Sequence, residues 1–127
     1  MAGPKKKRLG QAQEILTALG LPKEQRNERA GLTLLALADV RPGTPWAKAM
    51  SRMIGVTPIM EFAREHYGTR WAPNTRETVR RFTLHQFAQA GLVVANPDTP
   101  GRPTNSPKYC YEVTERALEV IRAFASD

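Results

Sequence analysis

Residues 74–90 carry side chains suited to reading nucleic-acid bases, at spacings that a single helix would bring together. An arginine guanidinium can donate two parallel hydrogen bonds to a guanine edge or a phosphate, and an asparagine amide can pair with an adenine edge. In a major groove, this stretch and the turn before it offer the candidate DNA contacts Arg70, Asn74, Thr75, Arg76, Thr78, Arg80, Arg81 and His85. An ordinary surface helix with solvated arginines is the alternative interpretation of the same residues.

Local signals predict the bounds and the two faces of this helix. Asn74 can cap its start, Glu77 can return a hydrogen bond as in a capping box, and Gly91 supplies a left-handed residue for its end. A period of 3.6 residues predicts a packed stripe of Val79, Phe82, Phe87 and Ala90, with Thr83 and Gln86 among them. The opposite side is predicted to hold Glu77, Arg81, Leu84, His85 and Ala88.

The charge of the chain favours a polyanionic partner. Its 127 residues include 19 Lys and Arg against 12 Asp and Glu, which gives a net charge of +7 and a pI near 10.1. Residues 1–30 hold seven basic and three acidic side chains, and residues 70–108 hold six and two, so each segment nets +4. Charge concentrated in two segments predicts nucleic acid as the first candidate partner and an anionic membrane as the second.

Several other protein classes do not fit the sequence. No apolar run approaches the ~18 residues of a transmembrane helix, and no signal peptide is visible. Cys110 is the single cysteine, which excludes an internal disulfide and agrees with a reducing cytoplasm, and its side chain is predicted to pack in the fold. No small-molecule ligand site is evident, because a phosphate-cradling Gly-rich loop is missing. The sequence leaves open whether the chain forms a homodimer.

The chain is predicted to form a basic flexible arm over residues 1–12 and a single domain over residues 13–127. The run from Pro4 to Arg8 either follows a phosphate backbone or is a solvated terminus. Helices are expected over 13–19 and about 23–38, then a short one after Thr44-Pro45, then one from Thr57-Pro58 that stops at Gly68. Trp46 is expected to anchor the connecting segment to the core.

A helix, a short Gly-bearing turn over 68–73 and a basic second helix make a helix-turn-helix. Strands over 92–95 and 109–113 then flank a proline-rich loop that carries Arg102, Asn105 and Lys108, and Thr114 caps a last helix. The predicted fold class is mainly α: a winged helix-turn-helix with a two-stranded wing hairpin and extra amino-terminal and carboxy-terminal helices. Because the wing tip has four prolines and no apolar side chain to bury, it predicts a contact with DNA by the helix and wing together.

Specific strings in this sequence carry a family resemblance. They include residues 32–37 (LTLLAL), 55–60 (GVTPIM), 72–81 (APNTRETVRR), 89–93 (QAGLV) and 102–108 (RPTNSPK). The chain resembles the amino-terminal winged-helix DNA-binding domain of BsuBI/PstI-type type II restriction endonucleases, over roughly residues 15 to 124. The resemblance implies a restriction-modification system, a separate magnesium-dependent nuclease domain after this one, and cleavage at CTGCAG.

No catalytic or metal-ligating residues are predicted within the 127 residues, so the chain as it stands is expected not to be an enzyme. Hydrolysis of this kind needs converging carboxylates and a lysine, and no Asp-x-Lys or Glu-x-Lys occurs. Magnesium is therefore implied only for the nuclease domain that this sequence lacks. A stand-alone winged-helix transcriptional regulator and a winged helix used for protein–protein contact are the alternatives, because fold alone does not decide function.

Overall fold

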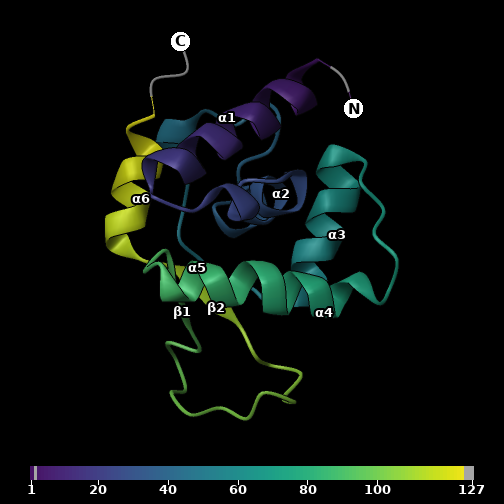
Figure 1. Cartoon of the computed structure of the whole chain (residues 1–127), viewed down its shortest axis with the longest axis vertical. Coiled ribbons are helices and arrows are strands. Elements are labelled where there is room, and N and C mark those ends of the chain that lie inside the picture. Colours follow the sequence, from purple (N-terminus) through teal and green to yellow (C-terminus); the bar gives the residue numbers. More distant parts are fainter. Residues whose placement is uncertain (2, 125–127) are drawn as a thin grey trace.

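The chain folds as helices packed around one central helix, with a long hairpin loop projecting from one side (Figure 1). The structure, a computed structural model, describes residues 1 and 3–124; Ala2 of the predicted arm and residues 125–127 of the predicted domain lie outside that description. The helices are α1 (Pro4–Ala18), α2 (Glu28–Leu37), α3 (Val56–Tyr67), α4 (Thr75–Val79), α5 (His85–Gln89) and α6 (Glu115–Arg122). The strands are β1 (Val93–Ala95) and β2 (Tyr111–Val113), and single helical turns are η1 (Lys23–Gln25), η2 (Trp46–Lys48) and η3 (Arg80–Leu84).

Helix α2 forms the centre of the core. Every residue from Ala30 to Ala38 is buried, so the helix is covered on all sides. Its start is set by Asn27, whose side-chain oxygen accepts a hydrogen bond of 2.8 Å from the backbone N–H of Ala30. The sequence prediction of one helix from Lys23 to Ala38 is therefore wrong at its beginning, because Asn27 is extended and separates η1 from α2.

Helix α1 begins at Pro4, so the predicted flexible arm over residues 1–12 is wrong from that residue onward. The lysines of the basic run are exposed, but Leu9 and Ala12 are buried and continue the apolar side of the helix toward Ile15. Leu9 packs so tightly on α2 that a Cβ on Gly31 would lie 2.6 Å from Leu9 Cδ1. The sequence analysis missed this part of the helix because the basic run precedes the apolar residues Leu9 and Ala12. Their role becomes evident only from the packing of α1 against α2.

The segment between α2 and α3 is held by Trp46, as the sequence predicted. Its ring is buried, its indole Nε1 donates a 2.9 Å hydrogen bond to Gln11 Oε1, and the ring of Phe124 meets it edge-on at 6.0 Å between centroids. Helix α3 then ends at Gly68, as the sequence predicted, and Gly68 has a left-handed conformation with φ of 70°.

The predicted wing hairpin is confirmed, with shorter strands than expected. Strands β1 and β2 are antiparallel, with Val93 opposite Val113. Ile54, in the connector before α3, exchanges two 2.9 Å backbone hydrogen bonds with Tyr111 and so adds a third line of pairing that the sequence did not predict. The loop between the strands extends away from the helices (Figure 1), while its base is fixed to the core.

A buried hydroxyl links α3 to the end of α2 and gives a test of this packing. The Tyr67 hydroxyl donates a 2.7 Å hydrogen bond to the Val40 carbonyl, and burial raises the pKa of that hydroxyl well above its usual range. We expect Tyr67→Phe to lower the free energy of unfolding by about 1–3 kcal/mol, because the carbonyl is left without a partner. Urea unfolding measures this change, and Tyr109→Phe in the partly exposed wing should be close to neutral.

The same hydroxyl also predicts an alkaline limit to stability. Its raised pKa means that the unfolded chain releases the tyrosine proton first, near pH 10. Stability should therefore fall as the pH rises above 10, and this slope should be shallower in Tyr67→Phe. An unchanged slope would show that Tyr67 ionises alike in both states.

Candidate nucleic-acid interface

Residues 75–89, here called the basic helix, run without a break through α4, η3 and α5, and they contain one turn of π-helix at Arg80–Leu84. A π-turn holds about one residue more than an α-turn, so the residues beyond it lag by about 100° of rotation. The buried positions consequently follow a spacing of four, five and eight residues from the first: Val79, Thr83, Leu84 and Phe87.

This rotation corrects the faces predicted from the sequence. Phe82 was placed in the packed stripe and is 54% exposed, whereas Leu84 was placed opposite and is fully buried. Ala90, also assigned to the stripe, is exposed at the helix end. Arg81 and His85 are exposed as predicted, and Gln89 joins them through a 3.2 Å contact between its Nε2 and His85 Nε2.

A polar contact from the core holds the basic helix in this rotation. Thr83 is buried, and its hydroxyl accepts a 3.0 Å hydrogen bond from Arg29 Nε on α2. The hydrogen bond to Thr83 and the apolar packing of Leu84 fall within the same turn of this helix. Arg29 therefore positions the helix that carries the candidate contacts.

The predicted capping box at the start of the basic helix does not form. Asn74 has helical backbone angles and makes no capping hydrogen bond, because the first amide groups are instead satisfied by the preceding turn, as in the 2.9 Å bond from Thr75 N to Ala72 O. Glu77 pairs with Arg80, whose hydrogen bond holds the pKa of the Glu77 carboxyl below its usual range. The Asn74 side chain is exposed and is not occupied by a cap.

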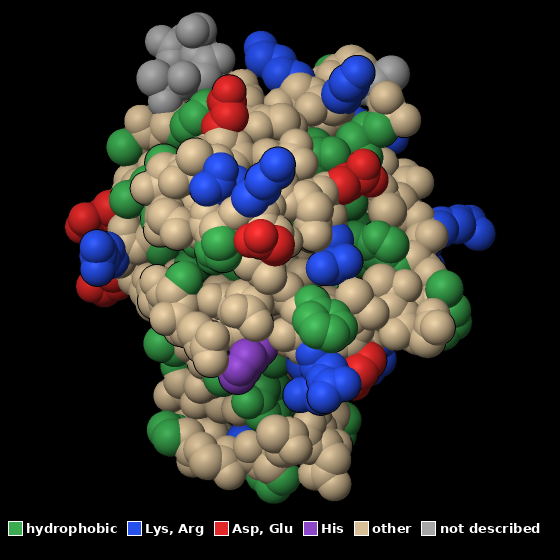
Figure 2. Space-filling model, viewed as in Figure 1, with side chains coloured by type: hydrophobic (Ala, Val, Ile, Leu, Met, Phe, Trp, Pro, Cys, Tyr) green, Lys and Arg blue, Asp and Glu red, His purple; other side chains and the backbone are tan. Residues whose placement is uncertain are grey.

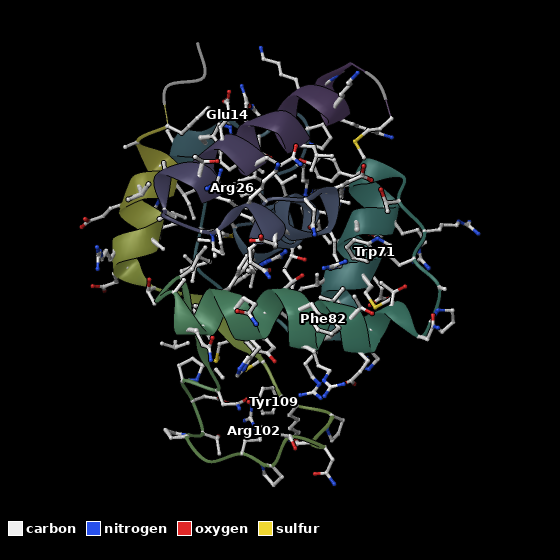
Figure 3. All side chains as sticks on the ribbon, in the orientation of Figure 1. Glu14, Arg26, Trp71, Phe82, Arg102 and Tyr109 are labelled. Carbon is white, nitrogen blue, oxygen red and sulfur yellow. The ribbon has the colours of Figure 1, made fainter. Side chains whose placement is uncertain are left out.

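The outer face of the basic helix contains an open depression of about 450 Å³, here called the Phe82 hollow. Its lining residues are Arg80, Arg81, Phe82, His85 and Gln86. Phe82 lies on the side of the helix turned to the viewer in Figure 3, and Figure 2 shows hydrophobic surface at that place above a group of basic side chains. Three predicted contact residues are thus brought together around an aromatic ring that the sequence analysis had assigned to the core.

A second depression of about 430 Å³, the Trp71 hollow, lies where the turn meets α3 and α4. Its lining residues are Thr57, Met60, Glu61, Arg64, Arg70, Trp71, Pro73 and Arg76. Arg76 donates a hydrogen bond to the Thr57 hydroxyl at the start of α3, which ties the two helices of the motif together. Arg64 was missed by the sequence analysis, since nothing in its local pattern marks it as a neighbour of the turn.

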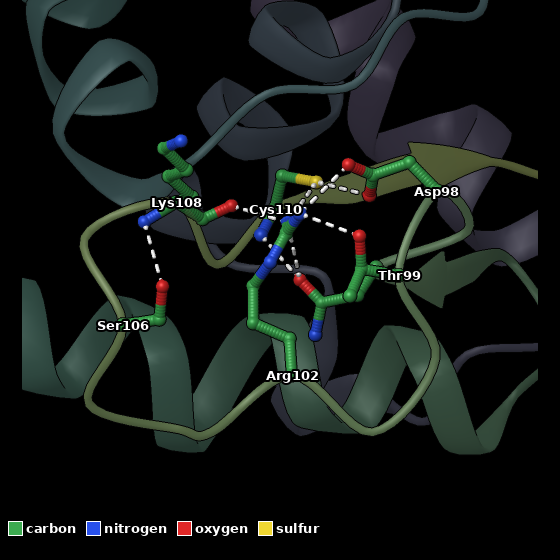
Figure 4. Close-up of polar contacts among 7 residues, drawn as sticks. Asp98, Thr99, Arg102, Ser106, Lys108 and Cys110 are labelled. Atoms are coloured by element: carbon green, nitrogen blue, oxygen red, sulfur yellow. Dashed lines mark hydrogen bonds and ion pairs between the residues drawn. The ribbon is translucent and has the colours of Figure 1, made fainter.

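The wing is organised around Arg102, which the sequence analysis had treated as a DNA contact. Its side chain is only 10% exposed, and it donates to Asp98 Oδ2 (2.7 Å), the Lys108 carbonyl (2.6 Å), Thr99 Oγ1 (3.0 Å) and Asn96 Oδ1 (3.2 Å) (Figure 4). The hydrogen bond from Arg102 also holds the pKa of Asp98 below its usual range. These bonds make Arg102 a positioning residue for the wing.

The other predicted contacts differ in accessibility. Asn105 and Lys108 are exposed on the wing loop, and Lys108 is therefore a better candidate for a phosphate than Arg102. Thr75 and Thr78 are partly buried at the start of the basic helix and line neither hollow. Within residues 1 and 3–124, no group of three or more His, Cys, Asp and Glu side chains is placed to hold a metal ion. Within the same residues, no helix is long and apolar enough to span a bilayer.

Comparisons with known proteins agree on one family. Residues 6–127 match the model described as the BsuBI/PstI restriction endonuclease HTH domain. The chain is 50% identical over 117 residues to the type II restriction enzyme BsuBI of Bacillus subtilis, covering 92% of this chain and 37% of that protein. It is 36% identical over 116 residues to AplI, a type II restriction enzyme of Arthrospira platensis, covering 91% and 36%. The structure of SdaI restriction endonuclease superposes with a TM-score of 0.84 at 34% identity, over 89% of this chain and 35% of that one.

The contacts of Arg102 predict that its removal disorders the wing locally. We expect Arg102→Ala to raise amide hydrogen exchange across residues 99–109 by about tenfold or more, since one charge-assisted hydrogen bond alone contributes about 1.5 kcal/mol. Lys108→Ala is the matched control, because it removes an exposed charge from the same loop. Equal protection in the two variants would mean that the guanidinium does not hold the loop.

Proposed function

Because this chain belongs to the BsuBI/PstI restriction endonuclease HTH domain family, we propose that it binds double-stranded DNA as the recognition domain of a type II restriction endonuclease. The observation that carries the proposal is the face of the basic helix, where Arg80, Arg81 and His85 line one hollow beside the wing. A helix fits the major groove of B-DNA, and basic side chains on its outer face reach base edges and phosphates there.

The described contacts support different tasks for the basic residues. Arg81 is exposed and is the first candidate to donate a bidentate pair of hydrogen bonds to a guanine. Arg80 is paired with Glu77, so a base or phosphate would have to replace that partner. Arg70 and Arg76 converge on the Trp71 hollow, at the edge of the motif where the DNA backbone would pass, and Lys108 would meet a phosphate from the wing.

We further propose that cleavage belongs to residues outside these 127. The chain spans about a third of the length of the curated relatives that it matches, and their names as restriction enzymes describe the whole proteins. The chain sequence contains no Asp-x-Lys or Glu-x-Lys from which to build a metal-dependent nuclease centre. Magnesium would accordingly be required by the nuclease part of a full-length protein rather than by this domain.

A salt titration tests the DNA-binding proposal. The basic helix, the turn and the wing should engage about five phosphates, which gives a slope near −4.5 for the logarithm of the association constant against the logarithm of salt concentration. Fluorescence anisotropy with a labelled duplex, across ~50 to 200 mM salt, measures this slope. A slope near zero would instead favour a winged helix that contacts protein.

Paired substitutions test which surface reads the sequence. Arg81→Ala should reduce the preference for a CTGCAG duplex over a scrambled duplex by about 1–3 kcal/mol, because a base-specific fork is lost. Lys108→Ala should weaken binding to both duplexes by the same factor and make the salt slope shallower, since a phosphate contact carries no sequence information. If the wing variant changed the preference and the helix variant did not, the wing would be the reader.

A further inference from the structure

We infer that Phe82 is a specificity-determining residue that packs against the 5-methyl group of a thymine in the major groove. The inference rests on the proposed DNA-binding function and adds a residue that the sequence analysis had assigned to the core. It is carried by three features of the structure: the exposure of the ring, the π-turn that places it outward, and the chemistry of its neighbours.

Phe82 is the most exposed large hydrophobic side chain among the described residues, at 54%. The other aromatic residue of the basic helix, Phe87, is fully buried, as are Trp46 and Tyr67. Exposing a phenyl ring forgoes the free energy of burying it, which a partner bound on the outer face would recover. Figure 3 places the ring on the outer side of the helix, where a groove-bound duplex would lie.

The exposure results from the way the helix is built. With the π-turn, the core positions are taken by Thr83 and Leu84, and the ring of Phe82 is turned outward. The hydrogen bond from Arg29 to Thr83 holds that rotation from the core side. Because π-turns are rare and occur frequently at functional sites, this one is consistent with a helix arranged to present a particular side chain.

The neighbours of Phe82 define what it can recognise. Arg80, Arg81, His85 and Gln86 line the same hollow and supply hydrogen-bonding groups, whereas a phenyl ring supplies neither donor nor acceptor. In the major groove the only apolar group on a base edge is the thymine methyl, and phenylalanine is one of the side chains that contact it. Insertion of the ring between minor-groove base steps would first require the duplex to be widened and kinked, because a helix about 10–12 Å across is wider than a groove of about 6 Å.

A methyl-deletion experiment tests this contact directly. The probe is the tightest duplex that the chain selects from a randomised library, made once with thymine and once with uracil, which lacks only the methyl group. We expect the unmodified chain to bind the uracil duplex about fourfold more weakly, which corresponds to ~0.8 kcal/mol for one buried methyl. Phe82→Ala should weaken binding to the thymine duplex and bind the two duplexes equally.

Two controls separate the ring from its surroundings. Arg81→Ala should bind more weakly yet keep the fourfold sensitivity to the methyl group. Val120→Ala removes an exposed apolar side chain from α6, outside the basic helix, and should leave both affinities unchanged. Thermal unfolding of each variant checks the fold, and Phe82→Ala should unfold normally because the ring is more than half exposed.

The outcomes distinguish the inference from the proposed function. If duplex binding showed no salt dependence, the proposed function would fail and the Phe82 contact with it. If binding kept a steep salt slope but was indifferent to the methyl group, or if Phe82→Ala stayed as sensitive as the unmodified chain, DNA binding would stand and the thymine contact would be overturned. Loss of methyl sensitivity in Phe82→Ala alone supports the inference.

Discussion

Helix α2 carries no solvent-facing side chain from Ala30 to Ala38, so every neighbouring element has to cover part of it. Helices α1 and α3, the basic helix and β2 all pack against it. Because the interior is close-packed, the side chains that α2 presents limit how each cover can be rotated. Gly31 admits Leu9 from α1, and Arg29 at the first turn reaches Thr83 in the basic helix. The outer face of the basic helix is thus set by contacts made on its opposite, buried side.

The π-turn at Arg80–Leu84 shows how the core and the outer face are coupled. Burying Val79, Leu84 and Phe87 on one side, with Thr83 toward Arg29, does not match an unbroken period of 3.6. The helix accommodates the mismatch with one wider turn, and everything beyond it is turned by about the angle of one residue. Arg81, Phe82 and His85 lie together on the outer surface of this helix.

The wing is stabilised in a different way from the helices, since a loop with four prolines has little apolar surface to bury. One guanidinium replaces a core by donating hydrogen bonds to acceptors on both arms of the loop, from Asn96 to Cys110. Asn96 is buried in a left-handed conformation with φ of 48°, and its side-chain oxygen also accepts a 2.9 Å hydrogen bond from the Cys110 N–H. An ordered loop loses less entropy when it meets a partner, which suits a wing that positions exposed charge.

Local patterns in the sequence determined the order of the elements, the end of α3 at Gly68, the Thr114 cap, the wing hairpin and the basic character of one helix, because these depend on residues a few positions apart. The tertiary structure decided the rest. Only packing against α2 extends α1 back to Pro4 and turns Phe82 outward in favour of Leu84. In the sequence Arg102 resembles the other basic residues of the wing, and only the folded loop shows that its side chain is enclosed. The helix features depend on partners distant in the sequence, such as Arg29 for Thr83, whereas the partners of Arg102 lie three to eight residues away and meet it because the loop folds back on itself. No spacing along the chain encodes which partner a side chain will meet.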